Sequence, residues 1–322
     1  MKFFYFLILL TTVSSQTFAQ KKIYLNEKLI EATTEENAMF YLLSEEGIVK
    51  EGTYFHTIYY LSGNIYRSYS TSLPHYLYAP KGHYTSYYES GNKYMEGFYS
   101  ENSTKKGIWK LYHDNGQLCL EYKIKPEGSV ISPQETILLI NGWNEWGRQT
   151  LIDGYGKVKY LWSDSILGAQ YYEEGKVEEA KKVSTWKAKY LTGDKYFKEK
   201  FSNGVLNKGI SWDGEFKKYV YSQLKESASF EGGIDKFLNH LQGRIQLPRI
   251  ARLKGNRGTT YTQFVVSRDG TLTDIKVLRS VSPSIDQECI RVLSQAPKWN
   301  PAKYRGQPLE ALEESMVLPI TF

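Results

Sequence analysis

The residue types that carry most enzyme chemistry occur in this 322-residue chain without the spacings that such chemistry requires. Ser227 and Ser229 lack the Gly-x-Ser-x-Gly elbow of a nucleophilic serine. Adjacent carboxylates, such as Glu173 and Glu174, would point to opposite faces of a strand, which is poor geometry for an acid–base pair. No histidine has metal-ligand spacing with a cysteine or with another histidine. The sequence therefore predicts no enzyme, no metal site and no cofactor. The histidines are His56, His75, His83, His113 and His240.

Cysteines and charge point in the same direction. Cys119 and Cys289 are the only cysteines, and we expect both to be small buried hydrophobes. Residues 232–322 hold 13 Lys and Arg against 8 Asp and Glu, while the rest of the chain holds 28 against 27. So mild an excess is typical of an ordinary solvated surface, and no basic helix accompanies it. A nucleic-acid partner is not expected.

The N-terminus has the features of a secretory signal peptide. Lys2 supplies a positive charge, Phe3 to Val13 form an apolar run, and Thr17 and Ala19 flank a small-residue cleavage point. A helix needs about 20 residues to span a bilayer, so this run is too short. We expect residues 1–19 to be removed and the chain to be exported. The alternative is an uncleaved N-terminus that anchors the chain in the inner membrane.

The middle of the chain contains an internal repeat. The phrase Tyr-x-x-x-Gly occurs at residues 59–63, 87–91, 112–116 and 171–175. Period and turn residues such as Asn115-Gly116 predict β-hairpins, each too small to bury its own face, which stack into an antiparallel sheet. Residues 20–230 are therefore predicted to form an elongated, mostly β repeat array. Little helix is expected there outside Glu31 to Leu43 and Lys176 to Lys182.

A second phrase supports the repeat. Gly107-Ile108-Trp109-Lys110-Leu111-Tyr112 and the later Trp186-Lys187 with Tyr190 resemble MORN-type repeats in their looser form. We expect Trp109 and Trp186 to occupy equivalent, buried positions. The many tyrosines are predicted to be the packing face of the sheet, and the alternative is a platform for a glycan or another ligand.

The last third of the chain predicts a helix, a hairpin, a helix and a strand. Apolar residues from Ile234 to Ile245 have helical spacing, and Asp269-Gly270 lies between two β-rich runs, as in a tight hairpin. Ser284 and Gln287 have capping-box spacing before a second helix that Pro297 ends. Met316 to Phe322 then predicts a final strand. Pro319 lacks an N–H, which favours an edge strand or a bulge.

At these positions the chain resembles the TonB C-terminal domain, over roughly residues 232–322. The Asp269-Gly270 turn, Pro297-Lys298-Trp299-Asn300-Pro301 and Leu318-Pro319-Ile320-Thr321-Phe322 carry the resemblance. It departs at Leu247, where the family usually has Tyr, and at Ala302, where it usually has Gly. The resemblance implies a periplasmic α+β domain at 231–322 that captures an extended segment of an outer-membrane receptor as an added strand. The partner-binding residues expected from it and from the final strand are Leu247, Pro248, Arg249, Glu314, Ser315, Met316, Val317 and Leu318.

Two other functions stay open. Energy transducers of this family keep a membrane anchor and a long Pro-rich linker, whereas only four of the ten prolines here precede the C-terminal domain. The chain could therefore be a periplasmic scaffold that binds proteins without transducing energy. It could also bind glycan or peptidoglycan through its repeats. The leading prediction is a TonB-family protein that binds TonB-dependent receptors and is linked to energised transport.

Overall fold

The chain forms two compact units, Met1–Gln117 and Leu118–Phe322. Both are rich in antiparallel strands, and the helices among the described residues lie at the end of the second unit, apart from one short 3-10 turn in the first. The predicted fold class, a mostly β array with a C-terminal α+β region, is confirmed. The computed structural model describes residues 22–26, 29–32, 34–43, 49–50, 53–77, 79–125, 137–164, 166–309 and 315–322.

The first unit is a meander of hairpins. Each strand from β4 to β8 pairs antiparallel with the next, and β4 also pairs with β2 and β3. Strand β1 continues the ladder on the far side of β2. The elements are β1 Lys22–Leu25, the 3-10 turn η1 Glu35–Asn37, β2 Phe40–Leu43, β3 Val49–Lys50, β4 Thr53–Tyr60, β5 Ile65–Thr71, β6 Lys81–Tyr87, β7 Lys93–Tyr99 and β8 Lys105–Tyr112.

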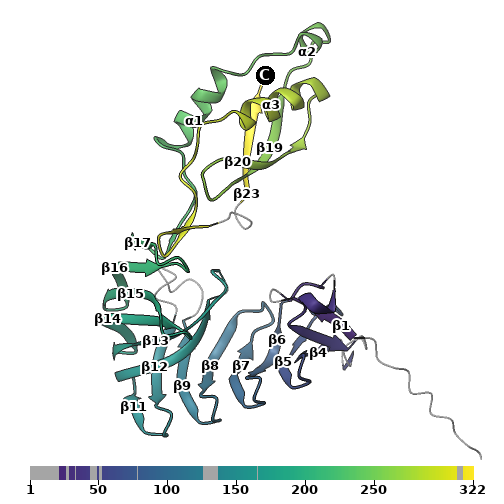
Figure 1. Ribbon diagram of the computed structural model, residues 1–322. Helices are drawn as coiled ribbons and strands as arrows, with labels where there is room; N and C mark the ends of the chain where they lie inside the picture. The colour runs from purple at the N-terminus through teal and green to yellow at the C-terminus, as the bar shows by residue number, and fades with distance from the viewer. Residues whose placement is uncertain are drawn as a thin grey trace, which may run out of the picture. The chain divides into compact units, whose positions relative to one another are not determined.

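The second unit begins with nine more strands, each paired antiparallel with the next (Figure 1). They are β9 Leu118–Ile124, β10 Ile137–Trp143, β11 Gln149–Ile152, β12 Tyr155–Asp164, β13 Ala169–Glu178, β14 Lys181–Tyr190, β15 Lys195–Ser202, β16 Val205–Trp212 and β17 Lys218–Tyr221.

The same turn closes most of these hairpins. At the first of them the Tyr60 N–H donates to the Asn64 carbonyl at 2.8 Å, and the Gly63 N–H donates back to the Tyr60 carbonyl at 2.9 Å. Gly63 has a φ of 94°, in the left-handed region that glycine adopts without strain. Local turn chemistry thus sets the repeat. The turns begin at Tyr60, Tyr88, Ser100, His113, Asn144, Tyr190 and Asp213.

A glycine under an aromatic ring defines the inner face of each unit. Trp109 and Trp186 are both 0% exposed, which confirms the predicted equivalence. A Cβ on Gly97 or Gly175 would lie 2.2 Å from the ring of Trp109 or Trp186, respectively. The strands can pack this tightly only because glycine has no side chain.

The position of Gly175 corrects one part of the predicted repeat. Tyr171 to Gly175 lies within β13, so this fourth Tyr-x-x-x-Gly phrase is not a turn; the equivalent turn runs from Tyr190 through Gly193. The helix expected at Lys176 to Lys182 is also wrong. That segment is the end of β13, a two-residue turn and the start of β14. The only helical residues within 31–43 that the structure describes are those of η1.

Tyrosine hydroxyls join consecutive repeats. Tyr60 Oη donates to the Tyr87 carbonyl at 2.9 Å, and Tyr88 Oη donates to the Tyr112 carbonyl at 2.8 Å. Tyr190 Oη makes the same bond to the Trp212 carbonyl at 3.1 Å. Each hydroxyl therefore reaches the residue at or next to the start of the following repeat's turn, so neighbouring repeats support one another.

The C-terminal region has the predicted order of helix, hairpin, helix and strand, with two additions. A short helix, α2, follows Pro248, and a small hairpin, β21–β22, lies before the last strand. The predicted capping box is wrong, because the helix begins at Pro283 with Ser282 as its N-cap, and Ser284 lies inside it. The elements are β18 Lys225–Glu226, α1 Gly233–Gln242, α2 Arg249–Leu253, β19 Thr259–Val266, β20 Leu272–Arg279, α3 Pro283–Ser294, β21 Lys303–Tyr304, β22 Gln307–Pro308 and β23 Ser315–Thr321.

This region has its own hydrophobic core. Phe237 of α1, Phe264 of β19 and Trp299 are buried together, with ring centroids 4.8 to 6.4 Å apart. Ile285 and Cys289 bring α3 onto the same cluster, and both cysteines of the chain are free and buried, as expected. The core holds the sheet β20-β19-β23 in place, with β23 at its edge as Pro319 predicted.

Candidate functional site

The last strand, β23, exposes one edge of the C-terminal sheet. It pairs antiparallel with β19 from Val265↔Ser315 to Thr259↔Thr321. Among the residues that the structure describes, no strand pairs with its other side. Such an edge presents a row of main-chain donors and acceptors to which an extended peptide can add as a strand.

The hydrogen bonds at the end of the strand show which groups face outward. Phe322 donates to the Gly258 carbonyl at 3.0 Å and accepts from the Gly258 N–H at 3.4 Å. Hydrogen-bonded and non-hydrogen-bonded pairs alternate along an antiparallel ladder, so every second residue back from Phe322 also faces β19. Thr262 Oγ1 donates to the Leu318 carbonyl at 3.1 Å, which agrees with this assignment.

The outward-facing residues are therefore Ser315, Val317, Pro319 and Thr321. Three of them offer both an N–H and a carbonyl to an incoming strand, whereas Pro319 offers a carbonyl alone. Their side chains are exposed, and that of Val317 is 54% exposed. Leu318 and Ile320 point into the core, and Met316 packs against it.

The structure brings the strand residues of the predicted site together but places the others on different elements. Leu247 packs against the same core as Leu318. Pro248 precedes α2 and Arg249 is its first residue. The segment before them is held to α3, where Gln246 N–H donates to Glu288 Oε1 at 2.9 Å. Glu314, the remaining predicted residue, lies outside the described residues, as do residues 1–21 with the predicted signal peptide.

Sequence reasoning missed a second feature, a contact between the hairpin β21–β22 and the array strands β12 to β16. Arg305, at the hairpin tip, is only 5% exposed. Its guanidinium forms an ion pair with Glu199 of β15 and lies 3.9 Å from Asp164 Oδ2 of β12. It also lies 3.7 Å from the centroid of the Phe197 ring. We call Arg305, Glu199, Asp164 and Phe197 the junction.

Hydrogen bonds from side chains and from a neighbouring strand fix the hairpin at the junction. Ser211 Oγ donates to the Arg305 carbonyl at 2.7 Å, and β21 pairs with β18. Tyr221 Oη donates to Glu199 Oε1 at 2.6 Å. Burial raises the pKa of the Glu199 carboxyl, and the charge of Arg305 opposes that rise. The Arg305-Gly306 pair is a turn signal that could have predicted the hairpin, but nothing in the sequence indicates where its tip docks.

A cavity of about 280 Å³ adjoins the junction. Its walls combine aromatic rings with charged side chains, among them Trp162, Tyr304, Lys182, Glu173 and Glu199. The carboxylates are already engaged, since Glu173 pairs with Lys182 and accepts from Tyr160 Oη. Glu173 with Lys182 and Glu199 with Arg305 thus neutralise each other in the cavity wall, whereas Lys125 and Lys181 add positive charge to it.

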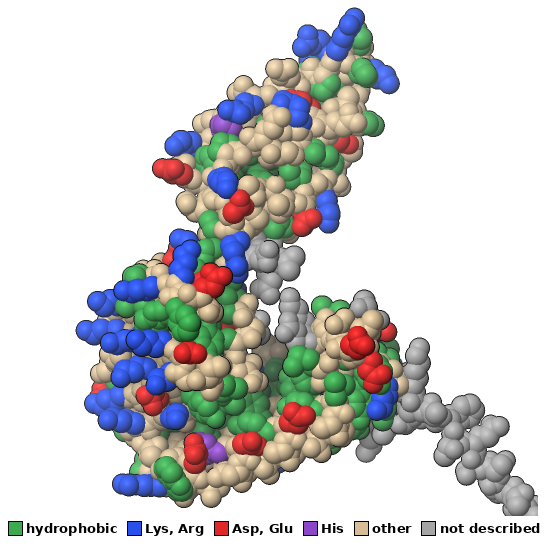
Figure 2. Space-filling view, in the orientation of Figure 1, with side chains coloured by type: hydrophobic (Ala, Val, Ile, Leu, Met, Phe, Trp, Pro, Cys, Tyr) green, Lys and Arg blue, Asp and Glu red, His purple; other side chains and the backbone are tan. Residues whose placement is uncertain are grey.

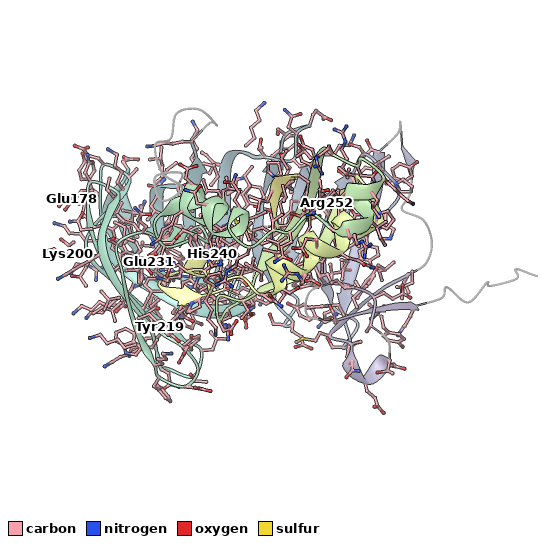
Figure 3. The ribbon with its side chains drawn as sticks, turned by 90° about the horizontal axis from the view of Figure 1, so that it is seen from above. Glu178, Lys200, Tyr219, Glu231, His240 and Arg252 are labelled. Atoms are coloured by element: carbon pink, nitrogen blue, oxygen red, sulfur yellow. The ribbon has the colours of Figure 1, made fainter. Side chains whose placement is uncertain are left out.

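The opposite, exposed face of the same strands is rich in lysine. Lys187 lies directly across from Lys198, and Lys200 across from Lys208. Figure 2 shows Lys and Arg side chains gathered on the outside of these strands, and Figure 3 labels Lys200, which points outward. Charges of one sign on paired strands repel, which is tolerated where water screens them. These strands therefore carry lysines on their exposed face, while the carboxylates of Asp164, Glu173 and Glu199 are buried. The near-zero net charge of the array does not reveal this separation of charge.

Fold and edge together define a class, an α+β domain with one open sheet edge that follows a β-hairpin array. Residues 244–322 match the family described as the Gram-negative bacterial TonB protein C-terminal, so this part of the chain is a TonB C-terminal domain, as its motifs predicted. That family is transport-associated and non-enzymatic, and its domains interact with outer-membrane receptors. No curated protein matches the chain.

Two further observations concern the described residues alone. His, Cys, Asp and Glu side chains do not gather there in any group of three that could hold a metal ion. None of the helices in that part of the chain combines the length and the apolar character needed to cross a bilayer.

Proposed function

We propose that this chain is a periplasmic TonB-family protein that binds TonB-dependent outer-membrane receptors by adding an extended receptor segment to the outer edge of β23. The observation that carries the proposal is the row of outward main-chain groups on Ser315, Val317, Pro319 and Thr321, in a domain of this family. Main-chain bonds supply most of the affinity, and the exposed side chains beside them select the sequence.

A pair of substitutions at Val317 tests the mechanism. The Val317 N–H faces away from β19, so Val317→Pro removes a donor to the ligand without removing a bond within the sheet. We expect Val317→Pro nearly to abolish binding of the full chain to synthetic peptides from receptor N-terminal segments, measured by calorimetric titration. Val317→Ala keeps the N–H and should bind within a few-fold of the parent.

Met316→Ala is the second control, because the Met316 side chain packs toward the core and its N–H faces β19. Binding should weaken only slightly. Circular dichroism establishes that each variant stays folded. Tight binding by a folded Val317→Pro variant contradicts strand addition at this edge.

The same proposal includes export and cleavage near Gln20, for which the N-terminal pattern of Lys2, Phe3–Val13 and Ala19 is the support. N-terminal sequencing of protein from the cell envelope separates two versions of the function. A start near Gln20 favours a periplasmic scaffold that binds without transducing energy. An intact N-terminus in the inner-membrane fraction favours an anchored energy transducer.

For the array we propose a supporting role as a folded MORN-like spacer for the C-terminal domain, whose boundary we place near residue 230. The buried rings of Trp109, Trp186 and Tyr196 favour packing over a glycan platform. Trp146, 83% exposed at a turn, is the side chain most available to a glycan or to peptidoglycan. Pull-down with purified peptidoglycan, with Trp146→Ala as the comparison, tests that alternative.

A further inference from the structure

The donors along the outer edge of β23 are interrupted. Ser315, Val317 and Thr321 each offer an N–H, but Pro319 lies between the last two and offers none. Outward donors on a strand recur every two residues, about 7 Å apart, so the gap from Val317 to Thr321 is about 13 Å. An incoming strand has a carbonyl opposite that gap, whether it runs parallel or antiparallel to β23.

We propose that Pro319 sets the register of the captured segment by ending its pairing with β23. The inference rests on the proposed function and adds which part of the edge is used. Main-chain pairing uses the N–H and carbonyl groups of Ser315 and Val317 and finishes at the Val317 carbonyl. At the next outward position, Pro319, the partner's carbonyl finds no donor, and an unmatched carbonyl that leaves water loses a bond without replacement.

The same geometry defines the chemistry of the segment. Residues of the added strand that lie directly across from Val317 place their side chains on the exposed face, beside the Val317 side chain. The residues between them point to the face where Met316 and Leu318 meet the core. The edge therefore fits a short extended segment whose alternate side chains are apolar, and whose pairing with β23 stops at one fixed point.

Pro319 is suited to this role because it removes no hydrogen bond within the sheet. Its missing N–H faces away from β19, opposite Tyr261 in a pair that does not exchange hydrogen bonds. Proline at such an outward position is compatible with an edge strand. Pro319→Ala should therefore leave the sheet intact and restore one outward donor.

Nested peptides test the register. A receptor peptide that binds the full chain is shortened residue by residue from each end, and each version is titrated into the parent and into Pro319→Ala. For the parent, we expect the residues at one end of the peptide to change the affinity less than twofold. In Pro319→Ala the same residues should raise it about three- to tenfold, the worth of one net hydrogen bond.

The control variants distinguish failure of the register stop at Pro319 from failure of strand addition at β23. Val317→Pro should abolish binding of every peptide; if it does not, strand addition at this edge fails. If Val317→Pro abolishes binding but the parent and Pro319→Ala depend identically on peptide length, only the register stop is overturned. The stop is also overturned if Pro319→Ala merely self-associates, as seen by analytical ultracentrifugation, because Pro319 would then guard the edge against pairing between copies.

Discussion

We expect the loss of the Arg305 guanidinium to lower the free energy of unfolding of the second unit substantially. It is 5% exposed and pairs with Glu199, which is 1% exposed. Arg305→Met keeps most of the aliphatic stem but removes the guanidinium that lies over Phe197, and it leaves the Glu199 carboxylate without its cation. Removing one partner of a buried pair costs about 3–5 kcal/mol. Tyr221 Oη still donates to Glu199, so we expect about 3 kcal/mol, the lower end.

The pH dependence of that loss identifies its cause. Burial already raises the pKa of Glu199 above its usual value, and without Arg305 the pKa must rise further. A carboxyl whose folded-state pKa is raised binds more protons in the folded state, so stability falls as pH rises above the unfolded pKa. The deficit of Arg305→Met should therefore be large at pH 7 and smaller at pH 5.

Urea unfolding of the full chain, followed by tryptophan fluorescence, measures the loss, and hydrogen exchange of peptides from β15 and β21 locates it. Arg305→Met with Glu199→Gln should recover most of the stability, because no buried charge is left unpaired. Arg279→Met, which removes an exposed arginine from β20, is the matched control and should cost under about 1 kcal/mol. The reasoning is refuted if Arg305→Met matches the parent at pH 7, or if the double variant recovers nothing.

Three further outcomes concern the repeats of both units. Trp109→Ala and Trp186→Ala should each lower the free energy of unfolding by about 3–5 kcal/mol in urea titrations. Gly97→Ala should be similarly damaging, because its Cβ would lie 2.2 Å from the Trp109 ring, whereas Gly214→Ala, with open space around it, should be neutral. Burial lowers the pKa of Lys105 to about 8. Since the folded state then binds fewer protons than the unfolded state, stability should rise between about pH 8 and 9.5. Lys105→Met should abolish that rise and Lys106→Met should keep it; a rise that survives in Lys105→Met assigns it to another group.

Local features of the chain were readable before the structure was known. Turn residues such as Asn115-Gly116 and Asp269-Gly270 act within four or five residues, so the hairpins followed directly from the sequence. Pro319 likewise predicted an edge strand, because a missing N–H is a property of one residue. The final strand was predicted at Met316 to Phe322, and the proposal that a partner segment adds to it came from the resemblance to the TonB C-terminal domain.

The sequence-based prediction failed where one sequence motif fits two local structures, where an element is too short to show a pattern, and where contacting residues are far apart in the sequence. Tyr-x-x-x-Gly places glycine in a turn at Gly63 but under a tryptophan in mid-strand at Gly175, and spacing alone does not separate the two. The five-residue helix α2 is too short for a periodic signal. Arg305 looks in sequence like any solvated charge, since its partner Glu199 lies 106 residues away.

The hydrogen bonds from Tyr60, Tyr88 and Tyr190 to the next repeat affect how the number of repeats can change during evolution. Since each repeat is fastened to its immediate successor, a whole repeat can be gained or lost while the contacts elsewhere stay the same. Two strands occupy about 10 Å of sheet, so the array changes length in steps of that size. A deletion of one residue within a strand has no such latitude, because it exchanges the buried and exposed faces. The number of repeats therefore sets the extent of the sheet in steps of two strands.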